Sequence, residues 1–275
     1  MQEPIKPLDR NQLSVLIAVC LLGAVLFRFI DFPEQVWDLE PLGSPLEIRV
    51  TSTWLLIALL VGLVSAGTNL ILHGHPRISE SLERPMYVFW ILPAVMTGLS
   101  AYVLSLVPSW PVWGGGVILL GIAIGLVISA EYATVVPGAK GYAAARLSLN
   151  MLAYFLTFVL FALIYYSRAR SLVSATLMAM VAILLATDLL SVADVPLRRV
   201  ALLALVVGLL IGECTWALNY WQINAWVGGL ILLLVFYVVV NIALQYLLER
   251  LGIMAIVEFV VVAVIVLVVI LLSIF

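Results

Sequence analysis

Residues 225 to 247 read AWVGGLILLLVFYVVVNIALQYL, a run without a single charged side chain. A helix needs about 20 apolar residues to cross the roughly 30 Å of hydrocarbon in a bilayer, so this stretch has the length and composition of one transmembrane span. Its apolar residues are continuous and do not alternate with polar ones, which excludes the strand of a membrane barrel. Because unpaired backbone groups are costly in lipid, the stretch predicts an α-helix.

Similar runs fill the chain, which has 275 residues, 65% of them hydrophobic and 10% charged, with a mean hydropathy of +1.24. We predict an all-α integral membrane protein, a single transmembrane domain over residues 1–275. Residues 31–51 are predicted as an outer loop on the membrane surface, because three prolines interrupt them. The nine predicted spans are 12–30, 52–72, 86–107, 113–135, 144–166, 171–192, 199–219, 225–247 and 252–274.

Basic residues predict the orientation in the membrane. Nine of the 13 Lys and Arg residues fall on the N-terminal side of the predicted spans, and four fall on the other side. The positive-inside rule then places the N-terminus in the cytoplasm and, after nine spans, the C-terminus outside, in what we expect to be a bacterial cytoplasmic membrane. A net charge of -2 without a basic tail excludes nucleic acid as a partner.

Two pairs of matching segments predict an internal repeat. Thr68-Asn69 and Thr187-Asp188 lie 119 residues apart near the ends of the second and sixth spans, and Trp113-Gly114-Gly115-Gly116 lies 113 residues before Trp226-Val227-Gly228-Gly229. A period of four helices gives parallel halves, over about 12–135 and 144–247, followed by the extra helix 252–274. We expect both glycine runs to permit close helix packing.

A few polar side chains interrupt the apolar runs. An ionisable group in hydrocarbon costs at least about 2.5 kcal/mol at mid-depth, so each one needs a partner, a wet cavity or a function. In the predicted topology all of them except Glu213 lie in the cytoplasmic half, which predicts a cavity open to the cytoplasm. These residues are Asn69, Glu131, Asn150, Asp188, Glu213, Asn241, Gln245 and Glu258.

With these features the chain resembles the UbiA-type intramembrane prenyltransferases, which have four plus four plus one spans and polar motifs after spans two and six. The motifs that match are Asn69-Leu70-Ile71-Leu72-His73-Gly74-His75-Pro76 and Asp188-Leu189-Leu190-Ser191-Val192-Ala193-Asp194. The resemblance implies an isoprenoid diphosphate donor, held by Mg²⁺ ions that carboxylate oxygens bind. It implies catalytic roles for Asp188 and Asp194 and metal binding by Asn69, His73 and Asp188.

The connection between spans four and five is also similar to this family, which places a tyrosine and basic residues near the donor phosphates. The resemblance therefore implies substrate binding by Tyr132, Lys140, Arg146 and Asn150, together with Asn69. The first motif departs from the family because Leu70 and His73 stand where acids are expected. The second departs because its acids are six residues apart, so the implied metal site is an altered one and the Mg²⁺ requirement stays open.

Other functions remain open at this stage. Glu131 can pair with Arg146 or Lys140 as a purely structural ion pair. Pro93 is the one break that suggests a transporter, which needs a polar path toward Glu213. The bare apolar face of residues 253–275 suits a scaffold that meets a partner membrane protein. The main prediction is a pocket for an isoprenoid or other lipid, with altered prenyl transfer or with binding alone.

Overall fold

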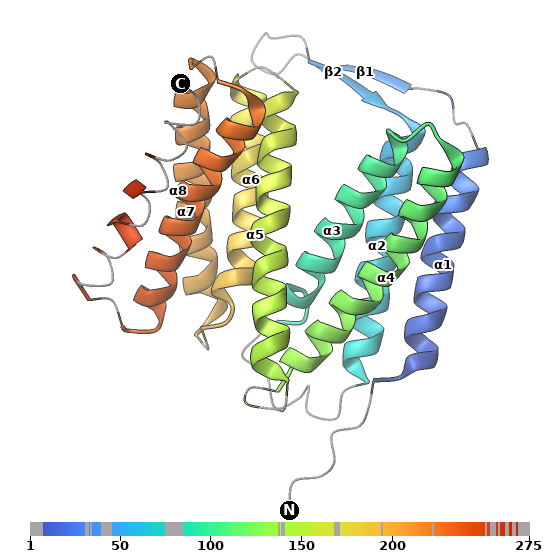
Figure 1. Cartoon of the computed structure of the whole chain (residues 1–275), viewed down its shortest axis with the longest axis horizontal. Helices are drawn as coiled ribbons and strands as arrows, with labels where there is room; N and C mark the ends of the chain where they lie inside the picture. The colour runs from blue at the N-terminus through green and yellow to red at the C-terminus, as the bar shows by residue number, and fades with distance from the viewer. Residues whose placement is uncertain are drawn as a thin grey trace, which may run out of the picture. The chain divides into compact units, whose positions relative to one another are not determined.

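The fold is an all-α bundle of membrane-spanning helices, shown by a computed structural model (Figure 1). The helices are α1 (Arg10–Phe29), α2 (Ser52–His73), α3 (Val88–Ser105), α4 (Trp110–Thr134), α5 (Tyr142–Tyr166), α6 (Ser171–Leu190), α7 (Leu197–Asn219) and α8 (Ala225–Leu247). All eight are long and apolar enough to cross a membrane. The structure describes residues 8–30, 33, 35–39, 46–74, 85–136, 138, 141–167, 171–193, 195–221, 223–250 and single positions between 252 and 268.

The first eight predicted spans coincide with these helices to within about three residues at each end. Most of the ninth predicted span lies outside the described residues, and its described residues between 253 and 268 are helical. Ile253 is exposed, whereas Phe259 packs edge-on against Tyr237 of α8 at 6.3 Å. The proposed partner surface of residues 253–275 therefore lies largely outside what the structure describes.

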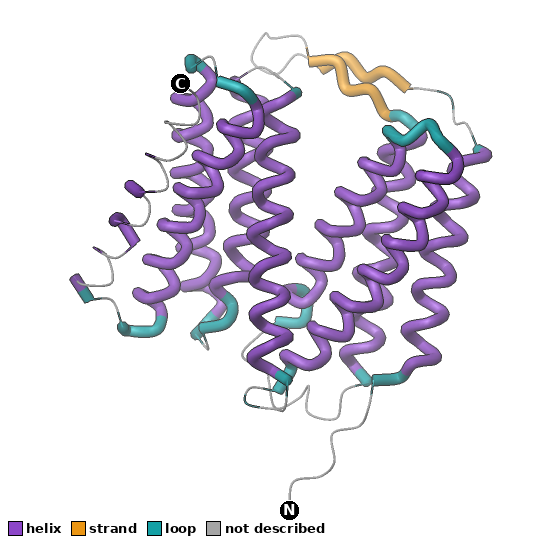
Figure 2. The backbone as a smooth tube through the Cα atoms, viewed as in Figure 1, coloured by secondary structure: helices purple, strands orange, loops and turns teal. Residues whose placement is uncertain are grey.

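The loop predicted for residues 31–51 contains a β-hairpin, so that prediction was incomplete. Strands β1 (Gln35–Leu39) and β2 (Leu46–Val50) pair antiparallel, with Trp37 opposite Ile48 (Figure 2). The signal lies in Leu46, Ile48 and Val50, which alternate with Glu47 and Arg49, as residues of a strand do.

The chain divides into two compact units, each with four of the helices. Unit 1 comprises residues 1–81 and 89–146, and unit 2 comprises 82–88 and 147–275. Unit 1 thus holds α1, α2, α4, nearly all of α3 and the first turn of α5, and unit 2 holds the rest of α5 with α6, α7 and α8. The boundary between the units falls inside α5, between residues 146 and 147.

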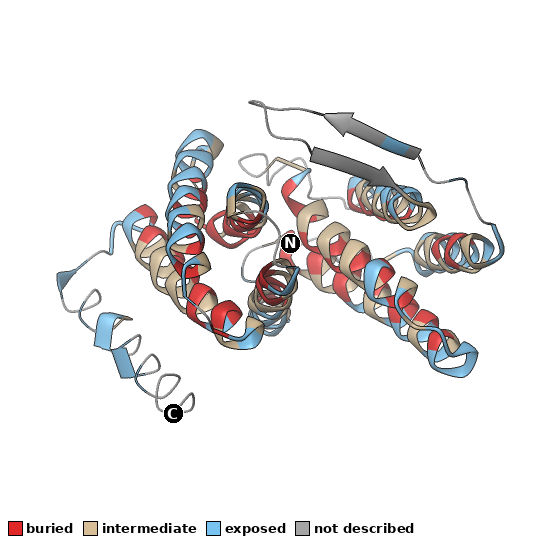
Figure 3. Ribbon diagram, turned by 90° about the horizontal axis from the view of Figure 1, so that it is seen from above, coloured by how far each residue is buried: buried red, intermediate tan, exposed pale blue. Residues whose placement is uncertain are grey.

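Unit 1 has two ends that matter for function. We call the end where α1 finishes, the hairpin lies and α2 and α4 begin the hairpin end (Figure 1). At the opposite end α2 and α4 finish. Its core forms where α1 packs against α2 and α4, and the ribbon is coloured as buried mainly on the sides of these helices that face one another (Figure 3). Pro93 is buried within α3, which stays helical on both sides of it, so the expected break is absent from α3.

The core of unit 2 forms where α6 packs closely against α7, with α8 against both. Gly208 permits this approach, since a Cβ atom there would lie against the side chain of Ile183 and 2.8 Å from the carbonyl oxygen of Ala179. Small residues let helix backbones come together where lipid supplies no hydrophobic drive.

The glycine runs behave differently from one another. A Cβ atom at Gly228 would meet the Tyr165 ring at 3.0 Å, and one at Gly229 would meet the Ala162 backbone at 3.0 Å, so close packing is confirmed there. In the first run Gly116 faces Leu104, but Gly114 and Gly115 face open space. The prediction was therefore wrong for these two residues, because their side of α4 meets no neighbour among the described residues.

Tyr165 ties the end of α5 to the end of α7. Its hydroxyl lies 2.9 Å from the carbonyl oxygen of Leu218, in the last turn of α7, and 3.1 Å from that of Trp221, just beyond the helix, so it can donate to the backbone at this end of α7. Tyr165→Phe is expected to lower the free energy of unfolding by about 1 kcal/mol. Denaturation in detergent measures this, with the exposed neighbour Tyr166→Phe as control. Equal stability of the two variants would show that the bond contributes nothing.

Candidate functional site

The residues predicted for the site are distributed over both units. Asn69, His73, Tyr132 and Arg146 belong to unit 1, whereas Asn150 and Asp188 belong to unit 2. Lys140 and Asp194 lie outside the described residues. Each unit is therefore described by itself.

The end of α2 presents its predicted ligands outward. Thr68 and Leu72 are fully buried, whereas Asn69 is half-buried and His73 is exposed. Asn69 and His73 lie one turn apart on the side of α2 that faces away from the core of unit 1. Among the described residues, no three His, Cys, Asp or Glu side chains come together as a metal site. The predicted set of Asn69, His73 and Asp188 is thus not assembled within either unit.

Two buried charges flank the connection between α4 and α5. Glu131 lies in the last turn of α4 with 1% of its surface exposed, and Arg146 lies near the start of α5 with 9% exposed. Thr134 is also buried, and its hydroxyl donates to the Glu131 carbonyl oxygen at 2.9 Å. Glu131, Tyr132 and Arg146 each have an interaction partner. Both charges belong to unit 1 and lie about one turn from the same connection, so they stand at the same depth.

The buried face of α5 continues from this charge. Leu149 and Ala153 are buried, and Asn150 follows Arg146 by one turn on the same face. The Oδ1 atom of Asn150 is buried and accepts no hydrogen bond from the residues that the structure describes. A buried acceptor without a donor costs about 1–3 kcal/mol, so a donor from a ligand or water would stabilise this position.

In unit 2, Asp188 is 2% exposed in the last turn of α6, and it has an interaction partner. The neighbouring hydroxyls bond to the backbone of the same segment. The Thr187 hydroxyl donates to the Ile183 carbonyl oxygen at 2.7 Å, and the Ser191 hydroxyl donates to the Thr187 carbonyl oxygen at 2.5 Å. A carboxylate at a helix C-terminus faces the negative end of the helix dipole, so burial there is unfavourable unless another group compensates it. This supports a functional or pairing role for Asp188.

Two other polar residues have a structural or peripheral position. Asn241 of α8 donates through Nδ2 to the Tyr154 hydroxyl of α5 at 3.1 Å and to the Tyr237 carbonyl at 2.8 Å. It therefore ties two helices together. Glu213 is exposed on α7. Glu258 lies outside the described residues.

The buried positions of the two units follow a common pattern, in a register that differs by one residue from the predicted repeat. The buried positions of α6 lie 118 residues after those of α2, not 119, and those of α8 lie 112 after those of α4, not 113. The matching sets are Leu60, Val64, Thr68, Ile71, Leu72 with Met178, Ala182, Ala186, Leu189, Leu190, and Val117, Leu120, Ile124, Ile128, Glu131 with Gly229, Leu232, Phe236, Val240, Ala243.

One residue turns a helix by about 100°, so the two registers bury different faces. In the register of burial Asp188 corresponds to the exposed Leu70, and Glu131 corresponds to Ala243. The units therefore share a packing pattern, whereas their buried acids occupy positions that are not equivalent.

A family model described as "Protein of unknown function (DUF5656)" matches residues 32–273. The chain belongs to this family. No curated protein and no solved structure matches the chain. The DUF5656 match covers all of the candidate site residues, from Asn69 to Asp194.

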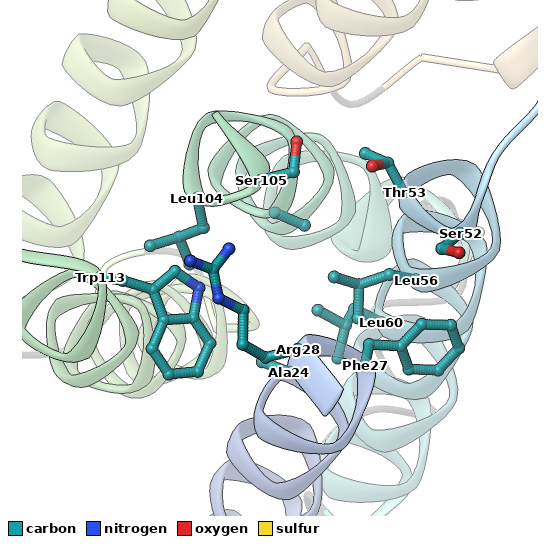
Figure 4. Close-up of a pocket in the computed structure, with 11 residues that line it drawn as sticks. Ala24, Phe27, Arg28, Ser52, Thr53, Leu56, Leu60, Leu104, Ser105 and Trp113 are labelled. Carbon is teal, nitrogen blue, oxygen red and sulfur yellow. The ribbon is translucent and has the colours of Figure 1, made fainter. Parts of the chain in front are cut away.

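Sequence reasoning missed Arg28 as a functional candidate. It lines a cavity of about 170 Å³ at the hairpin end of unit 1, with Trp113 beside it (Figure 4). The available signal was an arginine at the end of an apolar span, near Trp110 and Trp113 of a later span.

Proposed function

We propose that this membrane protein binds an isoprenoid or other membrane lipid, whose polar headgroup meets the first turns of α5 at Arg146 and Asn150. The observation that carries the proposal is the burial of Arg146, a permanently charged side chain with 9% exposure in a membrane-spanning helix. Charged residues buried inside membrane proteins are costly and mark binding or transport sites.

The neighbouring residues support a headgroup site. Arginine binds phosphate through parallel hydrogen bonds, and Asn150 one turn away has a buried acceptor that a headgroup hydroxyl can fill. Glu131 at the same depth offsets part of the arginine charge, which favours a ligand with both donors and acceptors. The resemblance to UbiA-type proteins, a prediction from the sequence, supports an isoprenoid as the lipid.

We propose binding rather than prenyl transfer. Mg²⁺ needs several carboxylate or phosphate oxygens, yet α2 contains no Asp or Glu over its entire length. Its predicted ligands, Asn69 and His73, are a neutral amide and an exposed imidazole. Transfer through Asp188 and Asp194 would need a metal site built from the second motif alone.

The proposed orientation has the N-terminus in the cytoplasm and the C-terminus outside, in a bacterial cytoplasmic membrane. Exposed tryptophans support this orientation. They lie near the starts of α2, α4 and α8 and near the end of α7, and these helix ends fall on the same side of the membrane if consecutive helices cross it in opposite directions. These tryptophans are Trp54, Trp110, Trp216, Trp221 and Trp226. The first turns of α5 then lie on the cytoplasmic side.

Native mass spectrometry of the protein extracted in mild detergent tests the proposal. The wild-type protein is expected to retain a lipid. In Arg146→Gln and in Asn150→Leu, the amount of retained lipid is expected to fall at least about tenfold. Arg198→Gln is the matched control, since Arg198 is exposed in the first turn of α7. Equal lipid retention in Arg146→Gln and Arg198→Gln would refute the site, provided that both elute as folded protein.

A further inference from the structure

The cavity at the hairpin end of unit 1 is separate from the proposed lipid site. It lies where α1 and α3 finish and α2 and α4 begin, at the other end of α4 from Glu131. All four helices contribute to its wall. Figure 4 shows Arg28 reaching across it from α1 toward Trp113, with Ser52 and Thr53 of α2 on another side.

The Arg28 guanidinium is held in place by aromatic rings. Its Cζ atom lies 5.3 Å from the centre of the Trp110 ring and 5.7 Å from that of Trp113, and these two rings pack edge-on at 5.7 Å. Its Nη2 atom donates to the Pro108 carbonyl oxygen at 3.2 Å. A guanidinium stacked in this way loses little further entropy when it binds an anion.

Within the part of the chain that the structure describes, this guanidinium uses few of its donors. Among the described residues, Pro108 alone accepts a hydrogen bond from Arg28. Thr53 brings a hydroxyl to the cavity, and Ser52 and Thr53 form the first turn of α2, whose positive dipole end adds to the arginine charge. Thr51, which precedes this helix, makes no side-chain cap. The polar side of the cavity is therefore suited to an anion.

The other side of the cavity is apolar. Leu56, Leu60 and Leu104 line it together with Ala24 and Ala101. A volume of about 170 Å³ holds a phosphate group and a few carbon atoms, and not a complete lipid. The combination of a fixed cation with an apolar wall fits the head of an amphiphile better than a free ion, which gains nothing from the leucines.

We propose that this cavity binds the phosphate group, and the first carbons, of an anionic amphiphile such as a phospholipid. Arg28 and Thr53 bind the phosphate oxygens, and the leucine wall receives the start of the chain. The cavity lies at one end of the spanning helices, beside the exposed Trp110. Tryptophans gather at the membrane–water interface, which is also the level of the lipid phosphates.

Fluorescence titration of the purified full-length protein in dodecyl maltoside tests this site, because Trp110 and Trp113 contact Arg28 and report on the ligand. Dodecyl phosphate is the probe, and inorganic phosphate is the comparison. Dodecyl phosphate is expected to bind, and inorganic phosphate is expected to bind at least about tenfold more weakly. Equal affinity for the two would overturn the assignment to an amphiphile, since the apolar wall would then contribute nothing.

Variants test the residues. Arg28→Gln is expected to weaken dodecyl phosphate binding at least about tenfold, and Arg10→Gln, at the exposed start of the same helix, is expected to leave it unchanged. Unchanged affinity in Arg28→Gln would overturn the proposal. Should Arg28→Gln not fold, Thr53→Leu decides, because it keeps Arg28 and fills the cavity: several-fold weaker binding supports the site, and wild-type affinity overturns it.

Discussion

Gly208→Ala is expected to destabilise the protein by about 2 kcal/mol, although alanine is the better helix former by about 1 kcal/mol. The added Cβ atom would lie 2.8 Å from the Ala179 carbonyl oxygen and against the Ile183 side chain. A side chain can rotate away, but a backbone carbonyl moves only if α6 and α7 separate. This pair forms the most extensive helix contact among the described residues of unit 2, so the cost falls on the core of that unit.

Gly212→Ala provides the matched control, since Gly212 lies one turn further along the same face of α7. There the new Cβ atom would lie 3.5 Å from both the Ala175 carbonyl oxygen and the Ala179 Cβ, an ordinary van der Waals contact. Gly212→Ala is expected to leave stability unchanged or to raise it by up to about 1 kcal/mol. Thermal unfolding in detergent compares the two. Equal midpoints would mean that the helices adjust at no cost and that Gly208 does not limit their distance.

Glu131→Leu is expected to lower the free energy of unfolding by about 3 kcal/mol. Glu131 and Arg146 are both buried in unit 1, in the last turn of α4 and near the start of α5. We expect them to form the ion pair that the sequence predicts. Removal of one member of a buried pair leaves the other charge in a low dielectric without compensation, which costs several kcal/mol. Glu213→Leu is the control, because Glu213 is exposed and its loss leaves no buried charge behind.

The double variant Glu131→Leu with Arg146→Leu separates pairing from independent roles. If the two side chains pair, the double variant recovers at least half of the stability that Glu131→Leu loses, because apolar groups replace both charges. Additive losses would contradict the pairing. The same variant is expected to lose its retained lipid while it recovers stability, so the structural and binding roles of Arg146 have separate readouts.

The sequence predicted the positions of the eight described helices because each depends on one contiguous run of apolar residues. It missed the hairpin of residues 35–50, since the prolines around it suggested an irregular loop and each strand has only five residues. Asp188 and Glu131 stood out because a charge in an apolar run is conspicuous, and both are buried in the structure. Arg146 was named only through the family resemblance and as a partner for Glu131, and it is buried as well.

The predicted register of the repeat differs by one residue from the register of burial, because similar residues in two helices do not identify the buried face of either. Thr68-Asn69 and Thr187-Asp188 look alike, yet Thr68 is buried in one helix and Asp188 in the other. In α4 the apolar residues are spread evenly around the helix, so no contrast between its faces indicates which side packs inward. Which side of α4 packs inward therefore depends on the helices that it contacts.

The apolar runs along the sequence determined that the chain is a multi-pass membrane protein and, to within about three residues, where its eight described helices lie, because the free energy of transfer of a segment into lipid is a sum over neighbouring residues. Tertiary structure alone decided which side of each helix is buried and which distant residues meet. The Arg28 cavity illustrates the difference: its cation and the Pro108 carbonyl that holds it are 80 residues apart. Contacts between segments remote in the chain depend on packing, and no local pattern in an evenly apolar helix encodes them.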